Sequence, residues 1–322
     1  MHMLPRLLVA LALLATPLDA ALAQEWPTHP LRIIVPFPAG GSADAQTRVI
    51  AAELANALSQ PVIVENKAGA GGNLGAAAAA HAAPDGYTLF LATSGTHASN
   101  ASLYKSLPYD PAKDFAPLTL VTLNPQLIVA GAKYKGFDLK GLIAALKQPN
   151  TQYGSSGIGS ATHIAGALFN RETGASLVHV PYRGQGPALN DLLGGRLDAM
   201  FPLVADVLPL VQSGKLEAVA IMREKRAPAL PDVPTTVELG FPALQMPPIW
   251  TALYTVAGTP APIVDRLNRE IVRIISAPAF TQRLAPAGYE VKTSTPAELA
   301  AFAASETAKW RAIVQRLDVH VE

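Results

Sequence analysis

The sequence has no cysteine and no strong excess of either charge. Cysteine is absent from all 322 residues, which excludes a disulfide framework, thiol catalysis and thiolate metal sites. Charged residues make up 15% of the chain and the formal net charge is +1, so the composition does not favour nucleic-acid binding. Half of the residues are hydrophobic, which is enough for a buried core, and the length allows two domains.

Long apolar runs are missing after the first residues of the chain. Leu7 to Ala15 form an apolar run behind Arg6, and Ala21-Leu22-Ala23 has the small–x–small pattern of a cleavage site. This arrangement is typical of a secretory signal peptide and is too short to span a bilayer. We expect residues 1–23 to be removed by cleavage after Ala23, which would leave a soluble periplasmic protein. The alternative is an uncleaved membrane anchor.

The motifs of several enzyme classes are also absent. The sequence contains neither G-x-S-x-G nor G-x-x-x-x-G-K-[ST] nor H-E-x-x-H, the signatures of a nucleophile elbow, a phosphate loop and a zinc protease. None of the seven histidines lies three or four residues from another, so no metal-ligand pair is formed. In the glycine-rich segment 69–75, Leu74 occupies the third glycine position of a dinucleotide motif. We therefore expect no catalytic residue, no metal and no cofactor.

The segment from Arg32 to Asp44 has the strongest pattern in the chain. Apolar residues 33–35 read as a buried strand, two prolines and two glycines stop it, and residues 44–59 read as a helix. A strand that turns through glycines into a helix leaves backbone N–H groups at the positive end of the helix dipole, where an anion can bind. The alternative is a tight turn without a ligand.

Further strands and helices follow in alternation through the first half. Residues 61–66 and 87–92 are expected strands, with a short helix over 76–83 between them. This order predicts a parallel sheet with helices on its faces. The strand over 87–92 leads into residues 93–100, a loop rich in hydroxyl groups. This loop lies at the carboxyl end of a strand, where open α/β sheets bind ligands. An ordinary helix cap is the alternative for each of these hydroxyls.

The second half repeats this arrangement. Residues 118–130 are an extended run with Asn124-Pro125 inside it, which predicts a crossing into a second domain. There a strand over 151–155 breaks into 156–163 before another helix, with Ser160 placed as N-cap. Strands are expected over 176–182, 197–201 and 216–222, helices over 138–147 and 188–193, and a return crossing over 249–254. Two helices, opened by Thr259-Pro260 and Thr295-Pro296, end the chain.

Six short motifs, in this order, resemble the substrate-binding proteins of tripartite tricarboxylate transporters, the Bug-type periplasmic receptors. The resemblance runs along essentially the whole chain after the leader. The motifs are Ile34–Asp44, Val64–Gly72, Asp85–Leu89, Val180–Gly184, Leu230–Thr235 and Gly258–Pro260.

The resemblance implies a two-lobed periplasmic-binding-protein fold, type II-like, with a mostly parallel sheet flanked by helices in each lobe and two crossover strands. Residues 24–123 and 249–322 would form lobe 1, and residues 124–248 would form lobe 2. The receptor would close on a small carboxylate and deliver it to membrane permease subunits, acting as a monomer. The ligand would be a di- or tricarboxylate, an acidic amino acid or an aromatic acid.

The resemblance also implies which residues contact the ligand. The first-lobe loop, its neighbours and the second-lobe loop supply them: Phe37, Ala39, Gly40, Gly41, Ser42, Asp44, Thr93, Ser94, His97, Ser155, Ser156, Gly157, Ser160, Thr162, His163 and Tyr182. His97 and His163 have a second interpretation as structural histidines.

Three functions remain open at this point. The first is a solute receptor for transport, and the second is a ligand-sensing protein that signals to a membrane partner through the same clamp. The third, an extracytoplasmic enzyme, has no motif in its favour. Neither candidate loop contains lysine or arginine, so a bound acid would be held by neutral donors that release it again.

Overall fold

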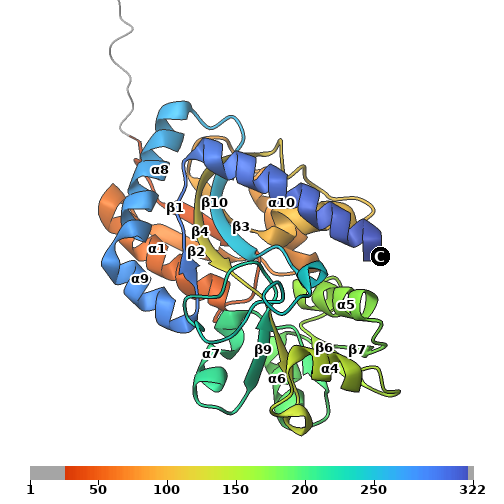
Figure 1. The fold of residues 1–322 in the computed structure, drawn as a ribbon. Coiled ribbons are helices and arrows are strands. Elements are labelled where there is room, and N and C mark those ends of the chain that lie inside the picture. Colours follow the sequence, from red (N-terminus) through yellow and green to blue (C-terminus); the bar gives the residue numbers. More distant parts are fainter. Residues whose placement is uncertain (1–25, 318–322) are drawn as a thin grey trace, which may run out of the picture.

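The computed structural model describes residues 26–317. The expected signal peptide lies outside the described residues. Within 26–317, no helix combines the length and the apolar character needed to cross a membrane. Two β-sheets, each covered by helices, make up the described chain (Figure 1).

The first sheet has six strands in the order β11-β4-β10-β3-β1-β2. Strand β1 pairs in parallel with β2 and β3, whereas β10 runs antiparallel to β3 and β4. The strands are β1 (Leu31–Val35), β2 (Val62–Asn66), β3 (Thr88–Thr93), β4 (Phe115–Asn124), β10 (Ile249–Val256) and β11 (Glu290–Val291).

Helices cover both faces of this sheet because neighbouring residues of β1 point to opposite sides. Ile33 belongs to the buried cluster that contains Leu54 of α1 and Ile271 of α8. Ile34 belongs to the cluster on the other face, with Ala76 of α2 and Trp310 of α10. The helices of the first sheet are α1 (Ser42–Leu58), α2 (Asn73–Ala80), α3 (Asn100–Leu103), α8 (Ala261–Ser276), α9 (Pro278–Leu284) and α10 (Pro296–Leu317).

The second sheet has five strands in the order β7-β6-β8-β5-β9. Helices α4 (Leu139–Ala145) and α5 (Ala161–Thr173) cover one face, and α6 (Gln185–Leu193) and α7 (Val204–Gln212) cover the other. The strands are β5 (Leu127–Ala130), β6 (Gln152–Ser155), β7 (Val178–Pro181), β8 (Ala199–Met200) and β9 (Glu217–Ile221).

The chain passes between the sheets twice. Residues 125–126 join β4 to β5, and residues 222–248 return from β9 to β10. Helix α10 also reaches from the first sheet to α5 of the second (Figure 1), where Arg316 and Glu172 form an ion pair at 3.4 Å. The expected extended run over 118–130 is thus two strands, because the chain breaks at Pro125.

Both sheets are mixed rather than mostly parallel. The strands that lead into the candidate loops, β1 and β6, do pair in parallel with their neighbours. Each antiparallel pair includes β4, β5 or β10, strands that border the two crossings between the sheets. The sequence pattern of the crossing strands does not reveal their direction, because a buried strand is apolar in either orientation.

Three local expectations are revised. The expected loop over 93–100 is helical from Ser94 onwards, because β3 leads directly into the π-helix η3 (Gly95–Ser99) and then α3. At this junction Thr93 and Thr96 exchange hydrogen bonds between backbone N–H and side-chain oxygen (3.0 and 3.3 Å). Thr259 does not cap α8, because its hydroxyl donates to the Val256 carbonyl at 2.8 Å. Helix α7, which contains Pro209, was not expected.

The N-terminus of α10, which Thr295-Pro296 opens as expected, carries a capping box. Thr295 N–H donates to the Glu298 carboxylate at 2.8 Å, and Glu298 N–H donates to the Thr295 hydroxyl at 3.2 Å. The buried residues of α8, which include Leu267 and Ile274, recur at the three- and four-residue spacing of one helix face. Such local features can be predicted from the sequence because they depend on residues three or four positions apart.

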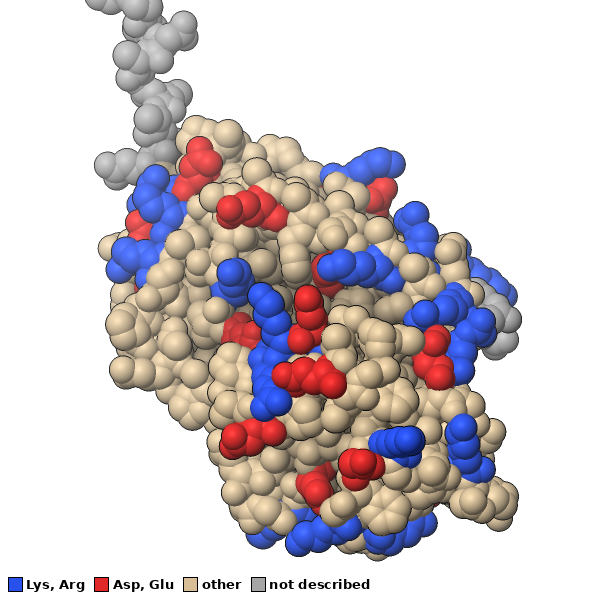
Figure 2. All heavy atoms as spheres, in the orientation of Figure 1, with Lys and Arg blue, Asp and Glu red and all other residues tan. Residues whose placement is uncertain are grey.

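The surface carries both charges in mixture. Basic and acidic side chains are interspersed over the face drawn in Figure 2, and many form ion pairs, for example Arg226 with Glu238 at 3.0 Å. A mixed surface of this kind provides no extended field of one sign.

Candidate functional site

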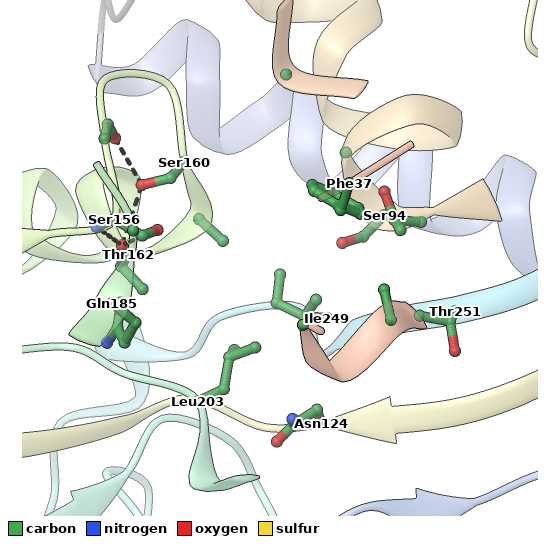
Figure 3. A pocket seen from close by; sticks show the side chains of 18 of the residues that line it. Phe37, Ser94, Asn124, Ser156, Ser160, Thr162, Gln185, Leu203, Ile249 and Thr251 are labelled. Atoms are coloured by element: carbon green, nitrogen blue, oxygen red, sulfur yellow. Dashed lines mark hydrogen bonds between the residues drawn. The ribbon is translucent and has the colours of Figure 1, made fainter. Parts of the chain in front are cut away.

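A cavity of about 660 Å³ lies between the two sheets. Its wall includes the segments that follow β1, β3 and β6 and the facing parts of β4 and β10. In the close view, Phe37 and Ser94 lie on one side, and Ser156, Ser160 and Thr162 lie on the other (Figure 3). The cavity is therefore bounded by both halves of the chain.

Nine of the sixteen expected ligand contacts border this cavity. They are Phe37, Ala39, Gly41, Thr93, Ser94, Ser156, Gly157, Ser160 and Thr162. Ser42 is the first residue of α1. The remaining six, which do not line the cavity wall, are Gly40, Asp44, His97, Ser155, His163 and Tyr182.

The turn between β1 and α1 is held by a buried carboxylate. Asp44 accepts hydrogen bonds from Gly40 N–H (2.9 Å), the Arg48 guanidinium (2.9 Å) and the Asn66 amide (3.0 Å). The Arg48 contact is the main reason that the pKa of Asp44 is lowered to about 2. Asn66 also donates to the Phe37 carbonyl at 3.0 Å. Asp44 therefore fixes the shape of the loop without lining the cavity, and its carboxylate already accepts three hydrogen bonds.

The N-terminus of α1 is left open towards the cavity. Its N-cap residue, Gly41, supplies no side-chain cap, and the first intrahelical bond runs from Ala45 N–H to the Gly41 carbonyl at 2.9 Å. The N–H groups of residues 42–44 precede that bond and have no acceptor within the helix. Because Ala39, Gly41 and Ala43 line the cavity, an anion there would meet the positive end of the helix dipole.

The second loop contains a cluster of three hydroxyl groups. Thr162 Oγ1 accepts from Ser156 N–H (2.9 Å) and lies within 3.1 Å of Ser156 Oγ and 3.0 Å of Ser160 Oγ. Ser160 Oγ donates to the Gly157 carbonyl (2.6 Å) and accepts from His163 N–H (3.2 Å). These bonds fix the loop that precedes α5, as the dashed lines in Figure 3 show for part of it.

Most backbone donors of this loop are thus used by the loop itself. The N–H groups of Ser156, Gly157 and Gly159 donate to Thr162, Ser155 and His163 side chains, in that order. The first intrahelical bond of α5 is made by Ile164 N–H to the Ser160 carbonyl. Among the described residues, the N–H groups at positions 158, 161 and 162 have no acceptor, so the available donors are one in the glycine turn and two at the helix start.

Ser155, His163 and His179 form a layer behind the second loop. The His163 and His179 rings stack with centroids 4.0 Å apart, and His179 Nε2 lies 2.7 Å from Ser155 Oγ. Burial, with a smaller effect of His163, lowers the pKa of His179 to about 4, and burial also lowers the pKa of His163. Both rings are therefore neutral at pH 7 and support the loop.

Tyr182 and His97 are directed to other partners. The Tyr182 hydroxyl donates to Asp191 at 2.7 Å. His97 is buried beneath η3, with ring centroids 4.4 Å from Tyr254 and 4.6 Å from Phe115, and burial lowers its pKa to about 3. The sequence places both residues near the loops, but aromatic packing and hydrogen bonding hold their side chains off the cavity wall.

The crossing strands provide cavity residues that the sequence analysis did not identify. Thr122 of β4 and Thr251 of β10 lie side by side, with their hydroxyl oxygens 2.7 Å apart, and both hydroxyls donate to Gln46 Oε1. Asn124, Ile249, Leu203, Gln185, Asp206, Tyr289 and Trp310 also line the cavity. The sequence places Asn124, Ile249 and both threonines in the two expected crossings but does not show that they meet at a cavity. The others lie on helices and loops whose approach to the cavity depends on the tertiary arrangement.

The cavity wall is poor in charge. Its described lining residues include no lysine, arginine or histidine, and Asp206 is the one acidic residue among them. Nowhere in residues 26–317 do three or more histidine, aspartate or glutamate side chains gather closely enough to hold a metal ion. The arrangement can bind a small polar molecule through neutral donors.

Comparison with known proteins gives a consistent result. The chain is 38% identical to protein BugT of Bordetella pertussis over 310 residues, which cover 95% of this chain and 94% of BugT. Its fold matches that of an R. palustris protein solved with adipate (TM-score 0.83, 31% identity, 92% of this chain and 99% of that one). It also matches MatC of Rhodopseudomonas palustris with bound malate (TM-score 0.79, 36% identity, 89% and 99%).

These matches confirm the expected two-lobed α/β binding-protein fold. Residues 46–319 match the family described as tripartite tricarboxylate transporter family receptor, a family of substrate-binding receptors rather than enzymes. The chain belongs to this family, the TctC receptors of tripartite tricarboxylate transporters.

Proposed function

We propose that this protein is an extracytoplasmic solute receptor that captures one small carboxylate in its cavity and delivers it to the membrane permease of a tripartite transporter. One observation carries the proposal: the N-termini of α1 and α5, which belong to different sheets, border the same cavity. Helix N-termini suit anions because their first N–H groups are unpaired. The relatives bound to adipate and malate support the carboxylate class.

The expected contact residues have two roles in this proposal. Those on the cavity wall, such as Gly41, Ser94 and Ser160, would contact the acid or its bridging waters. Those behind the wall, such as Asp44 and His163, would hold the two loops in place. Because the part of the wall formed by residues 26–317 contains no lysine or arginine, no full counter-charge there would hold the acid, and it could leave again.

Closure would follow from the position of the cavity between two lobes. In this proposal, residues 24–123 and 249–322 form lobe 1, residues 124–248 form lobe 2, and the two crossings serve as the hinge. An acid that touches both lobes only in the closed form shifts the equilibrium towards closure. A single chain supplies both sides of the cavity, so a monomer would suffice.

The binding part of the proposal is tested by thermal denaturation with a panel of acids. A ligand at about 100 times its Kd stabilises the folded state by about 2.7 kcal/mol, and we expect at least one of succinate, malate, glutarate, adipate or benzoate to raise the Tm. The matched control is the corresponding diamide, such as adipamide, which lacks the charge. No shift with any acid, confirmed by an absence of binding heat, would contradict carboxylate capture.

The delivery part needs a separate experiment. Cells that carry the membrane subunits of the transporter are supplied with the labelled acid, with and without this receptor. We expect uptake only when the receptor is present. Binding in vitro together with uptake that does not depend on the receptor would contradict delivery while leaving capture intact.

A further inference from the structure

The cavity has an unusual charge balance for a site that takes an acid. The proposed carboxylate would meet no cationic side chain, while Asp206 places a second acidic group on the same wall. Two carboxylates close together repel each other unless a proton or a donor lies between them. An acidic side chain on the wall would therefore favour some acids over others.

Asp206 is held in a fixed position next to a crossing strand. It lies in the first turn of α7, whose start is fixed by bonds from Val204 N–H to the Pro125 carbonyl (3.0 Å) and from Ala205 N–H to Asn124 Oδ1 (3.3 Å). Asn124 and Leu203, on either side of these contacts, also line the cavity. The carboxyl group is thus carried by an element distinct from the two candidate loops.

Within the described part of the chain, no basic side chain forms an ion pair with this carboxyl group. Arg223, which follows α7 in the sequence, is paired with Glu290. Asp206 is half-buried. Burial raises its pKa to about 6, opposed only by a hydrogen bond from the Leu203 backbone.

A structural role for Asp206 in α7 is the alternative. An acidic residue in the first turn of a helix interacts favourably with the helix dipole. Asp206 also accepts a hydrogen bond from the Leu203 backbone, which lowers its pKa, while burial raises the pKa by more. A carboxyl group can accept further hydrogen bonds, and because Asp206 lies on the cavity wall, a donor group of a ligand could provide one.

We propose that Asp206 is the specificity-determining residue of the cavity and that the preferred ligand is a carboxylate that also carries an amino or hydroxyl donor facing α7. This inference rests on the proposed function, since it takes the loops to hold the carboxylate. An ammonium group would be favoured most, because it provides both donors and the missing positive charge. A plain dicarboxylate would be disfavoured at neutral pH by repulsion from Asp206.

The test compares acids of equal chain length that differ at one end. Binding is measured by calorimetry at pH 8 for succinate, 4-aminobutanoate and 4-hydroxybutanoate, and for adipate, 6-aminohexanoate and 6-hydroxyhexanoate. In the wild-type protein we expect the amino acid of at least one set to bind at least about tenfold more tightly than its dicarboxylate, a difference of about 1.4 kcal/mol. The hydroxy acid should lie between them.

The variant Asp206→Asn keeps the shape of the side chain and removes its charge. We expect it to weaken binding of the amino acid about tenfold and to strengthen binding of the dicarboxylate, so that the preference disappears or reverses. The matched control is Asp232→Asn, which makes the same change at an exposed position outside the cavity and should leave both affinities unchanged. A Tm no lower than that of the wild type would show that Asp206→Asn is folded.

The possible failures are distinguishable. Binding of the acids with the same ratio in the wild type and Asp206→Asn would overturn the role of Asp206 and leave the receptor function standing. Absence of binding of every acid to both proteins would overturn the proposed function and this inference together.

Discussion

Gly41 and Gly157 line the same cavity from different sheets. Gly41 is the N-cap residue of α1 and follows β1 in the chain, and Gly157 lies in the turn between β6 and α5. Each half of the chain therefore brings a strand, a glycine turn and a helix start to one place. A receptor that closes on a ligand requires such an arrangement, because the ligand must contact both halves of the chain.

Replacing Gly41 tests whether the backbone of the first loop contacts the ligand. Its φ and ψ of −77° and 170° are extended, and an added Cβ would lie 3.6 Å from the Pro38 carbonyl oxygen, an ordinary contact. Gly41→Val should therefore fold with a Tm close to the wild type, while its side chain covers the start of α1. We expect at least about a tenfold loss of affinity, or 1.4 kcal/mol, in calorimetry.

The control for Gly41→Val is Gly186→Val. Gly186 lies outside the cavity wall, and an added Cβ meets nothing within 4 Å. This variant should keep its affinity. Undiminished affinity in Gly41→Val would mean that the loop is an ordinary turn.

Thr162 is expected to hold the second loop through its hydroxyl. Thr162→Val keeps the shape but leaves Ser156 N–H without its acceptor, whereas Thr162→Ser keeps the oxygen. The Ser156 N–H is only partly buried, so the loss should lie at the lower end of the cost of an unsatisfied buried donor, about 1 kcal/mol. Urea denaturation should show a loss of this size for the valine variant and a smaller one for serine. Ligand affinity should fall in the same order, and equal effects of the two variants would count against the hydroxyl.

Asp44 should make stability depend on pH in the acid range. Its folded pKa of about 2 lies below the ordinary value of 3.8, so its stabilising contribution is present above pH 3.8 and is lost as the pH falls towards 2. Asp44→Asn should be less stable than the wild type at pH 6, and this difference should shrink between pH 4 and pH 2. Denaturation curves across this range check it, with Asp232→Asn as a control. A difference that is constant with pH would contradict the assignment.

The His163–His179 stack should make the protein sensitive to moderate acid. The pKa of His179 is lowered to about 4 from 6.5, so the unfolded chain takes up a proton first, and stability is lost as the pH falls from 6.5 through 4. His179→Gln can still bond Ser155 and should lose less stability over this interval. The control is His81→Gln, which makes the same change at an exposed position. Stability that falls equally with pH in the wild type, His179→Gln and His81→Gln would refute the prediction.

The sequence predicts the parts of the site that depend on near neighbours. The turn after β1 follows from its prolines and glycines, and the Ser160 cap from its place before α5. Side-chain direction was harder to predict. Tyr182 and His97 are next to the loops in sequence, yet Asp191 and the Phe115–Tyr254 cluster hold them elsewhere.

The sequence indicates the two crossing segments but not which of their side chains meet at the cavity. Thr122 and Thr251 meet only because β4 and β10 pair antiparallel. Asp206 lies on a helix that the sequence analysis did not expect, since Pro209 interrupts its pattern. These positions depend on the tertiary arrangement, which residue spacing does not encode.

The most direct test of the account is a crystal structure of the protein with the acid that gives the largest thermal shift. We expect one ligand carboxylate within hydrogen-bond distance of backbone N–H groups at the start of α1 and of donors at the start of α5. A carboxylate held by residues of one sheet only, or bound outside this cavity, would contradict the account.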